Sequence, residues 1–460
     1  MTALARRKRG PNARGEWRSK ALSRVAVWAR AVRPADPCFR ADSVAGPTFT
    51  SRCAFANGRN KIDASFATYA GHDSPTPQVA AIVFAMEVPL LDLRQQYAGS
   101  LKEEIRSAID RVCDAQALIL GPHVEGFEKN LAAYCGTKHA IGVSSGTDAL
   151  LASLMALDIK AGDEVIVPAF TFFATAVCVA RVGATPVFVD IDPKTFNIDV
   201  SQVKAAITAK TKAIIPVDLF GQVADIEAIN EIACANGLYT IEDAAQAIGA
   251  KRNGRPACSQ AAMGCLSFYP TKNLGAFGDA GAVCTNSDEL ATKLRKIRVH
   301  GSGHTYFHET VGGMFRLAAI QAAVLDVKLK YLDDWHDARR RHAAIYDRVL
   351  AGTSVVTPPI AAGNQSIYNQ YVVRVQNRDA IKAKLAEKKI GSAVYYPLGL
   401  HLQECFKYLA HRPGDFPETE RATQEVLALP VYPELTDEQV TFAAETLKEI
   451  AGSGRRAAGG

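Results

Sequence analysis

The sequence predicts an α/β protein with a mostly parallel β-sheet, and two observations support this fold class. From residue 86 onward, short apolar runs of strand length alternate with stretches of helical periodicity, separated by short turns. Strands that alternate with helices form βαβ units, whose strands run parallel. The 460 residues are 48% hydrophobic and 22% charged, as in ordinary globular proteins. Their number suggests two or three domains, and no apolar run reaches the roughly 18–20 residues that span a membrane.

Residues 1–85 differ from the rest of the chain in charge and pattern. They hold 14 Lys or Arg and 5 Asp or Glu, so the net charge of +6 divides into +9 here and −3 beyond. The basic character therefore gives no reason to expect nucleic-acid binding by the remainder. Without a sustained period this stretch is not expected to fold as a domain, and an Arg-rich transit peptide stays possible. The abrupt change at Met86 favours a natural start there, with 1–85 a disordered or mis-annotated leader.

Periodicity places the individual elements along the chain. Helices are expected at 101–114, 124–134 and 147–157, and strands at 140–143, 164–168, 186–189, 213–217 and 238–241. Two short strands, 267–269 and 282–285, precede two long helices, 318–331 and 335–350. Beyond Pro358 a smaller α+β region is expected, with strands at 371–375 and 392–395 and helices at 378–388 and 437–450.

The ten cysteines are scattered and form neither a CxxC pair nor a Cys/His cluster. This pattern is typical of reduced thiols in a cytoplasmic protein and argues against a structural metal site. We therefore expect a cytoplasmic protein without a metal and without a membrane partner.

A possible phosphate site lies where the strand 140–143 gives way to a helix. Ser145, Gly146, Thr147 and Asp148 occupy this junction. A helix N-terminus presents free backbone N–H groups and the positive end of the helix dipole, and glycine allows close approach of the backbone. A plain N-cap by serine or threonine would give the same pattern.

Two further residues have the types and positions that catalysis requires. Asp243 ends an apolar strand, at the sheet edge where α/β proteins bind ligands, although it could simply cap the next helix. Lys272 follows a short strand and precedes a glycine-rich run, 275–281. A partly desolvated lysine becomes a usable nucleophile, whereas most lysines are solvated surface residues.

Together, these features make up the set that holds pyridoxal phosphate. The lysine, 29 residues after the aspartate, would form the Schiff base, and the aspartate would keep the ring nitrogen protonated. Phe172, in the run 171–175, could stack on the ring, or could pack in the core. The order of the motifs favours the cofactor site over the separate structural explanations.

With these motifs in this order, the sequence resembles the DegT/DnrJ/EryC1/StrS family of pyridoxal-phosphate-dependent sugar aminotransferases, which have the aspartate aminotransferase (type I) fold. The resemblance covers residues 89 to about 447. It is carried by the segments 119–122, 144–150, 168–172, 189–192, 242–247, 267–275, 278–279, 400–403, 414–420 and 427–430.

The resemblance implies a mixed, mostly parallel seven-stranded sheet between helices and a smaller C-terminal α+β domain. The corresponding ranges are 86–335 for the large cofactor-binding domain, 336–451 for the small domain and 452–460 for a flexible tail. It also implies roles for individual residues: Lys272 as catalytic lysine, Asp243 at the ring nitrogen, Gln246 at the phenolic oxygen, Phe172 on the ring, and Gly146, Thr147 and Ser267 at the phosphate.

One stretch departs from the family pattern. The family completes each site with an asparagine of a partner subunit, within Gly-x-Asn-x-Arg, but this chain has Met314 there. Methionine cannot donate the amide hydrogen bond, and its loss could cost roughly 1.5–3 kcal/mol of cofactor binding. Ala318 also stands where the family has an aspartate.

The activity that the resemblance implies is transfer of an amino group, from L-glutamate, to a nucleotide-linked keto sugar by a homodimer with shared active sites. Tyr306, His308, Tyr396 and His401 are candidates for the sugar pocket, or else surface aromatics and a core histidine. A dehydratase of the same family would have histidine in place of Lys272. A non-catalytic regulatory or scaffold protein is the alternative that Met314 and Ala318 suggest.

Overall fold

The computed structural model describes residues 86–304 and 306–457, and the side chains up to residue 452. The expectations for residues 1–85, and for the last three residues of the tail, lie outside this range. Within the described range, no helix is both long and apolar enough to cross a membrane.

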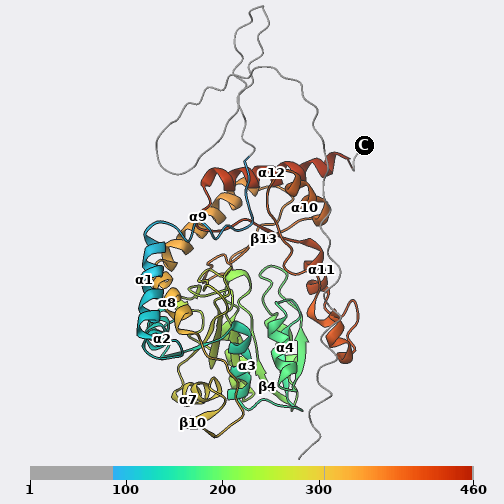
Figure 1. Cartoon of the computed structure of the whole chain (residues 1–460). Coiled ribbons are helices and arrows are strands. Elements are labelled where there is room, and N and C mark those ends of the chain that lie inside the picture. The colour runs from blue at the N-terminus through green and yellow to red at the C-terminus, as the bar shows by residue number, and fades with distance from the viewer. Residues whose placement is uncertain (1–85, 305, 458–460) are drawn as a thin grey trace, which may run out of the picture. The chain divides into compact units, whose positions relative to one another are not determined.

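The centre of the described unit is a mixed sheet of seven strands (Figure 1). Its spatial order is β1, β9, β8, β5, β4, β2, β3, and β9 alone runs antiparallel to its neighbours. This matches the sheet that the family resemblance implied. The strand bounds are β1 His139–Val143, β2 Glu164–Pro168, β3 Thr185–Val189, β4 Thr211–Ile214, β5 Tyr239–Asp243, β8 Met263–Ser267 and β9 Gly281–Thr285.

Helices cover both faces of the sheet, which gives three layers. One face packs against α3 (Gly146–Ala156), α4 (Ala174–Arg181) and α7 (Asp288–Ile297) through a single apolar cluster. On the other face, α1 (Gly99–Ala115), α2 (Pro122–Tyr134) and α8 (Ala319–Leu329) cover one end, while α5 (Val200–Val203) and α6 (Ile226–Ala235) cover the other. Because both faces are buried, most strand residues are apolar, and the polar ones stand mainly at the strand ends.

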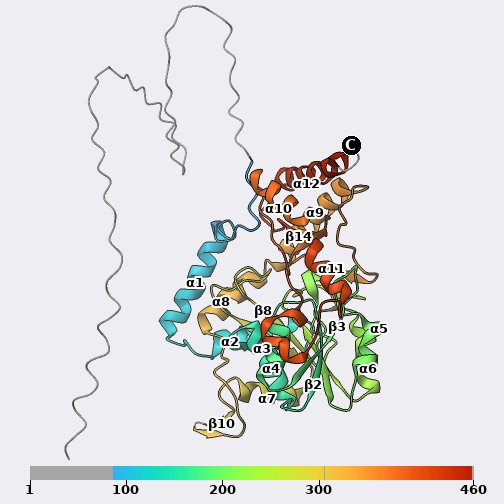
Figure 2. The same cartoon turned by 90° about the vertical axis from the view of Figure 1, so that its right-hand side faces the viewer.

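The C-terminal region forms its own apolar cluster around a two-stranded antiparallel pair. Its elements are α9 Leu332–Leu350, β13 Tyr371–Arg374, α10 Arg378–Glu387, α11 Pro417–Glu425, β14 Val426–Leu429 and α12 Asp437–Ala457. The expected helix at 437–450 therefore continues for seven residues beyond its predicted end. Figures 1 and 2 show α9, α10 and α12 grouped at one end of the described unit, whereas α11 lies nearer to the sheet.

The remaining elements are short. They are β6 Lys251–Arg252, β7 Arg255–Pro256, β10 Ser302–His304, β11 Phe307–His308 and β12 Asn364–Gln365, with 3₁₀ turns η1 Lys204–Ala206, η2 Leu219–Gly221, η3 Leu400–Leu402 and η4 Glu404–Leu409.

Two predicted strands are wrong. The strand expected at 267–269 is β8, which ends at Ser267, because the chain then enters the tight loop that carries Lys272. The strand expected at 392–395 is a single bridge between Ala393 and Ala428. Beyond that bridge the side chains of residues 394–396 pack into an apolar cluster with Phe170 and Phe196 and do not extend the ladder.

Candidate active site

Lys272 lies in a tight loop directly after β8. Its backbone N–H donates to the carbonyl of Tyr269 at 2.8 Å, and the loop closes where the Ala276 N–H donates to the Phe268 carbonyl, also at 2.8 Å. A side chain at Gly275 would lie 2.3 Å from the Pro270 carbonyl oxygen, so only glycine fits there. The glycine-rich run thus holds the lysine in a fixed loop, as its sequence predicted.

The Lys272 amine lies in a largely dehydrated environment. Burial lowers its pKa to about 8, and the negative charge of Asp243 opposes this shift only in part. A lysine with this pKa is partly neutral near physiological pH, so it can act as a nucleophile or accept a proton. The alternative of an ordinary solvated surface lysine does not fit this environment.

Asp243 is buried at the C-terminal end of β5, on the same side of the sheet as Lys272. Its Oδ2 accepts a hydrogen bond from the Thr175 hydroxyl at 2.8 Å, and its Oδ1 accepts one from the Ala245 N–H at 3.2 Å. Burial raises the pKa of Asp243, while these donors and Lys272 lower it. A further positive group placed against this carboxylate would stabilise its ionised form.

The turn from β1 into α3 forms a narrow cradle. Ser145 is the N-cap of α3, and its hydroxyl accepts the Asp148 N–H at 3.0 Å. A side chain at Gly146 would lie 2.6 Å from the Cβ of Ser267, so the glycine lets the ends of β1 and β8 meet. The first N–H groups of α3, at Gly146 and Thr147, are left for an anion near the Ser267 hydroxyl.

Gln246 and Tyr396 meet at a second side of the site. The Gln246 side-chain carbonyl accepts the Phe220 N–H at 2.8 Å, and its amide donates to the Tyr396 hydroxyl at 3.1 Å. The ring of Phe172 lies 6.2 Å from that of Tyr396 and is 57% exposed. Phe172 is therefore not a core residue, and its ring is available for stacking.

These residues fit pyridoxal phosphate. The cradle at Gly146 offers unpaired N–H donors to a phosphate and has no room for a larger side chain. Lys272 supplies an amine of lowered pKa, and buried Asp243 supplies an acidic partner for a ring nitrogen. Which of these residues touch the cofactor remains a prediction.

His401 lies in the environment expected for the second of its two interpretations, a core histidine. It is buried, its Nε2 lies 3.1 Å from Oε1 of Glu420, and its ring is 4.7 Å from that of Phe416. Burial lowers the pKa of His401, and Glu420 opposes that shift. These contacts fit the alternative of a structural histidine that holds the segment after η4.

Tyr306 and His308 belong to the hairpin of β10 and β11, which lies beside α7 at the end of the unit away from α12 (Figures 1 and 2). Tyr306 is 90% exposed, and Nδ1 of His308 lies 2.9 Å from the His300 carbonyl oxygen. The aromatic tip of the hairpin therefore points outward. Neither the exposure of Tyr306 nor the contact of His308 with His300 places these residues at the Lys272 site of the same chain. Its place in a sugar pocket remains a prediction.

Sequence reasoning missed two supports of the site. Thr175 holds Asp243 through its hydroxyl, and the backbone of Phe220 holds Gln246. Thr175 lies in the same short run as Phe172, which was the only available signal. The Phe220 contact depends on a turn with a φ of +60°, which no residue pattern announced.

The segment with Met314 and Ala318 runs beside the cradle. Ser144, just before the cradle, donates its N–H to the Phe315 carbonyl at 2.9 Å. Met314 is 64% exposed, so it faces away from this chain's own interior. Ala318 is the N-cap of α8 and provides no side-chain acceptor there.

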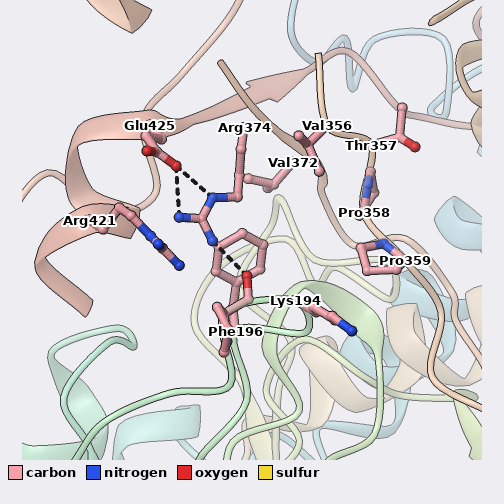
Figure 3. A pocket seen from close by; sticks show the side chains of 11 residues that line it. Lys194, Phe196, Val356, Thr357, Pro358, Pro359, Val372, Arg374, Arg421 and Glu425 are labelled. Atoms are coloured by element: carbon pink, nitrogen blue, oxygen red, sulfur yellow. Dashed lines mark hydrogen bonds and ion pairs between the residues drawn. The ribbon is translucent and has the colours of Figure 1, made fainter. Parts of the chain in front are cut away.

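A separate cavity of about 380 Å³ lies between the loop that follows β3 and the C-terminal region (Figure 3). Arg374 crosses it, with its guanidinium bonded to Glu425 at 2.7–2.8 Å and to the Pro193 carbonyl at 2.6 Å. None of the predicted site residues lines this cavity. It is therefore not the site built around Lys272.

Comparisons with known proteins agree with this geometry. The chain is 52% identical over 79% of its length to 99% of the pleiotropic regulatory protein of Geobacillus stearothermophilus. It is 43% identical over 78% of its length to 97% of the UDP-N-acetyl-3-dehydro-α-D-glucosamine 3-aminotransferase of Acidithiobacillus ferrooxidans. The crystal structure of DesV from S. venezuelae is 42% identical and covers 79% of this chain and 98% of its own, with a TM-score of 0.78.

The family model for DegT/DnrJ/EryC1/StrS aminotransferases matches residues 99–448. Aminotransferases of this family depend on pyridoxal phosphate, and the predictions of family, fold class, enzyme class and cofactor are confirmed at this level. Taken with the partly buried lysine of lowered pKa, the strand-end aspartate and the glycine cradle, this match shows that the chain belongs to the DegT/DnrJ/EryC1/StrS aminotransferase family.

Proposed function

We propose that this aminotransferase moves an amino group from L-glutamate to a nucleotide-linked 3-keto sugar in the cytoplasm, with pyridoxal phosphate held on Lys272. The observation that supports it most strongly is the pairing of Lys272, whose pKa is lowered to about 8, with buried Asp243 in one dehydrated site. The product is an amino sugar of the kind used in polysaccharides, glycans or antibiotics.

When bound, the cofactor supplies an electron sink and carries the amino group between the two substrates. The Lys272 Nζ would hold the cofactor and, once freed, take a proton from the α-carbon of the amino donor and return it. Its lowered pKa suits both directions of this transfer, because a base works best near the ambient pH. The tight loop from Tyr269 to Gly275 keeps that nitrogen in place.

Other residues would orient the cofactor. Asp243, fixed by Thr175, would keep a proton on the ring nitrogen. Gln246, fixed by the Phe220 N–H, would approach the phenolic oxygen. Gly146, Thr147 and Ser267 would bind the phosphate at the N-terminus of α3, and exposed Phe172 would cover the ring.

The name of the relative from Acidithiobacillus ferrooxidans supports the choice of a 3-keto sugar, since it places the new amino group at carbon 3 of a UDP-linked sugar. Two other relatives, at 41–42% identity, have names that place an amino group at the same carbon of dTDP-linked sugars. We therefore infer amination at carbon 3 and leave both nucleotides as candidates.

We propose a homodimer as the working unit, since the segments beside the cradle expose large apolar side chains in a single chain. Met314 belongs to the segment that runs beside the cradle, and its side chain is 64% exposed. The side chain of Ile119 is 62% exposed. A two-fold partner would cover both residues and would bring the same segments to the second site. The aromatic tip at Tyr306 would reach a partner's sugar pocket in the same arrangement.

The test uses purified chain loaded with pyridoxal phosphate and a panel of UDP- and dTDP-linked 3-keto and 4-keto sugars. Glutamate-dependent formation of a 3-amino sugar, detected by mass spectrometry, is the expected result. Amination only of 4-keto sugars would overturn the choice of carbon, and turnover with another amino donor alone would overturn glutamate.

A regulatory protein is the second candidate, which the name of the relative from Geobacillus stearothermophilus favours. Lys272, Asp243 and Gln246 are all present, so a regulator would still bind the cofactor. The two functions separate in a half-reaction: an aminotransferase converts the bound cofactor to its amine form with glutamate, and a non-catalytic protein does not. The lysine at 272 disfavours the dehydratase.

A further inference from the structure

A buried pair of carboxyl groups, Asp218 and Glu242, lies behind Asp243 and has no part in the chemistry described so far. Asp218 has no exposed surface and Glu242 is 1% exposed. Successive side chains of a strand point to opposite faces, so Glu242 of β5 points away from the face that carries Asp243. The two acids therefore lie in the apolar core on the far side of the sheet.

Each of the two carboxyl groups has one oxygen without an N–H or hydroxyl donor. Oδ1 of Asp218 accepts the Ala224 N–H at 2.8 Å, and Oε2 of Glu242 accepts the Cys258 N–H at 3.0 Å. Oδ2 of Asp218 and Oε1 of Glu242 have no such donor among the described residues. The two side chains are nevertheless within hydrogen-bond contact of each other. Two bare carboxylates in contact inside an apolar core would repel strongly.

We propose that Asp218 and Glu242 share one proton at neutral pH, and that this proton-linked pair positions Asp243 and Gln246. The claim that the pair positions Asp243 and Gln246 rests on the proposed function, because it matters for catalysis only if these two residues bind the cofactor. The shared proton itself does not depend on any catalytic role.

Burial raises the pKa of both carboxyl groups. The charges of Glu242 and Asp243 raise the pKa of Asp218 further, whereas the hydrogen bond with Asp218 lowers the pKa of Glu242. The other groups that act most strongly around the pair are also acids, from α6, β9 and the end of α2: Glu227, Cys284 and Cys135. None of them brings a positive charge that could replace the proton.

Two hydrogen bonds of Asp218 connect it to residues that support the active site. Its own N–H donates to the Asp243 carbonyl at 3.0 Å, which ties it to the backbone of the catalytic strand. Its side chain holds the Ala224 N–H and so closes the turn that contains Phe220. The Phe220 N–H in turn fixes Gln246. Breaking the pair would loosen both supports at once.

The shared proton makes a signed prediction for stability. An unfolded chain releases this proton near the ordinary aspartate pKa of about 3.9, whereas the folded chain keeps it. The stabilisation is therefore complete below that pH and declines as the pH rises toward the folded-state pKa. It declines by about tenfold in the folded-to-unfolded ratio per pH unit.

The experiment measures denaturant unfolding of the full chain at pH 5, 6 and 7, for wild type, Glu242→Gln and Asp218→Asn. In either variant the amide donates to the remaining carboxylate, and no shared proton is left to titrate. We expect the wild-type stability, relative to either variant, to fall about tenfold per pH unit over this range. Glu404→Gln, which removes an exposed carboxylate, is the control and should follow wild type.

Kinetics test the positioning role. Glu242→Gln should keep kcat within about threefold, whereas Glu242→Leu, which cannot bond Asp218, should lower kcat by about 10- to 100-fold. Equal stability-versus-pH slopes for wild type, Glu242→Gln and Asp218→Asn would overturn the shared proton. A folded Glu242→Leu with wild-type kcat would overturn the positioning. If the leucine variant does not fold, the slopes of the amide variants still decide the first claim, and they do so even if the proposed transamination fails.

Discussion

The two faces of strand β5 carry adjacent buried acids in contrasting surroundings. Asp243 faces a hydroxyl, a backbone N–H and the Lys272 amine, so donors and a cation surround it. Glu242, one residue earlier, faces another acid and three thiols across the core. Burial alone therefore does not determine the protonation state of a carboxyl group; the neighbouring donors and charges do. The donors around Asp243 suit an ionised group, and the acid beside Glu242 requires a retained proton.

The largest expected effect comes from removing the amine on the Asp243 face. Lys272→Ala should lower transamination by at least about 10³-fold and abolish the visible absorbance of lysine-bound cofactor, because no other amine occupies that loop. Lys272→Arg is the matched control, which should bind cofactor without the covalent link. Turnover of Lys272→Ala with an unchanged spectrum would contradict the site.

The next largest effect is expected at Asp243, and it distinguishes the role of this acid from that of Glu242. Asp243→Asn should lower kcat on the order of 10³-fold with the fold intact, since an amide cannot keep a ring nitrogen protonated. Thr175→Val removes only one hydrogen bond to that carboxylate and should cost roughly tenfold. Steady-state kinetics and circular dichroism provide the measurements. Near wild-type turnover of Asp243→Asn would show that the two faces do not differ as described.

A pH series sharpens the description of the Lys272 face. The free amine is the reactive form, and the pKa of Lys272 is lowered to about 8. The rate at which cofactor-free protein captures pyridoxal phosphate should therefore rise about tenfold per pH unit below pH 8 and level off above it. Stopped-flow absorbance follows the capture. A rate that continues to rise to pH 10 would indicate an ordinary lysine.

A substitution at Met314 tests whether the phosphate site lacks the hydrogen-bond donor that the family's asparagine supplies from the partner subunit. Met314→Asn should tighten cofactor binding by roughly tenfold or more, because an added hydrogen bond to a charged phosphate contributes about 1.5–3 kcal/mol. Equilibrium dialysis measures the change, with Val311→Asn, at an exposed position of the same segment, as control. Equal tightening by both variants would show that the effect does not come from position 314.

The smallest effect lies outside both faces, at the start of α8. Ala318→Asp places an acceptor at an N-cap that now has none and should raise the free energy of unfolding by about 1 kcal/mol. Ala318→Leu, which has no oxygen to offer, should give no gain. Equal stability of the aspartate and alanine chains would show that the α8 terminus is already satisfied.

Much of the site could be predicted from the sequence, because its main residues stand where strands end. Asp243 ends an apolar strand, and Gly146 and Lys272 lie in the turns that follow two others, so all three stand at one edge of the sheet. Thr175 and Phe220 could not be predicted in the same way. They reach their partners across 68 and 26 residues, so their contacts depend on how the helices pack.

Other features that the sequence does not reveal have similar causes. The contacts of His401 with Glu420 and Phe416, which fit its interpretation as a core histidine, have no signal in the sequence around it. The strand at 392–395 has the right composition, but its side chains pack into the cluster around Phe170. The proton that we propose for Asp218 and Glu242 requires the turn after β4 to bring Asp218 beside β5, which their spacing of 24 residues does not reveal.

The most direct test of the central claim is the position of the covalent bond to pyridoxal phosphate. Borohydride reduction of the loaded chain, followed by peptide mapping, should place a single pyridoxyl group on Lys272, and pretreatment with glutamate should remove the label. A label on another lysine, or a label that glutamate leaves unchanged, would contradict the account of Lys272 as the catalytic amine of an aminotransferase.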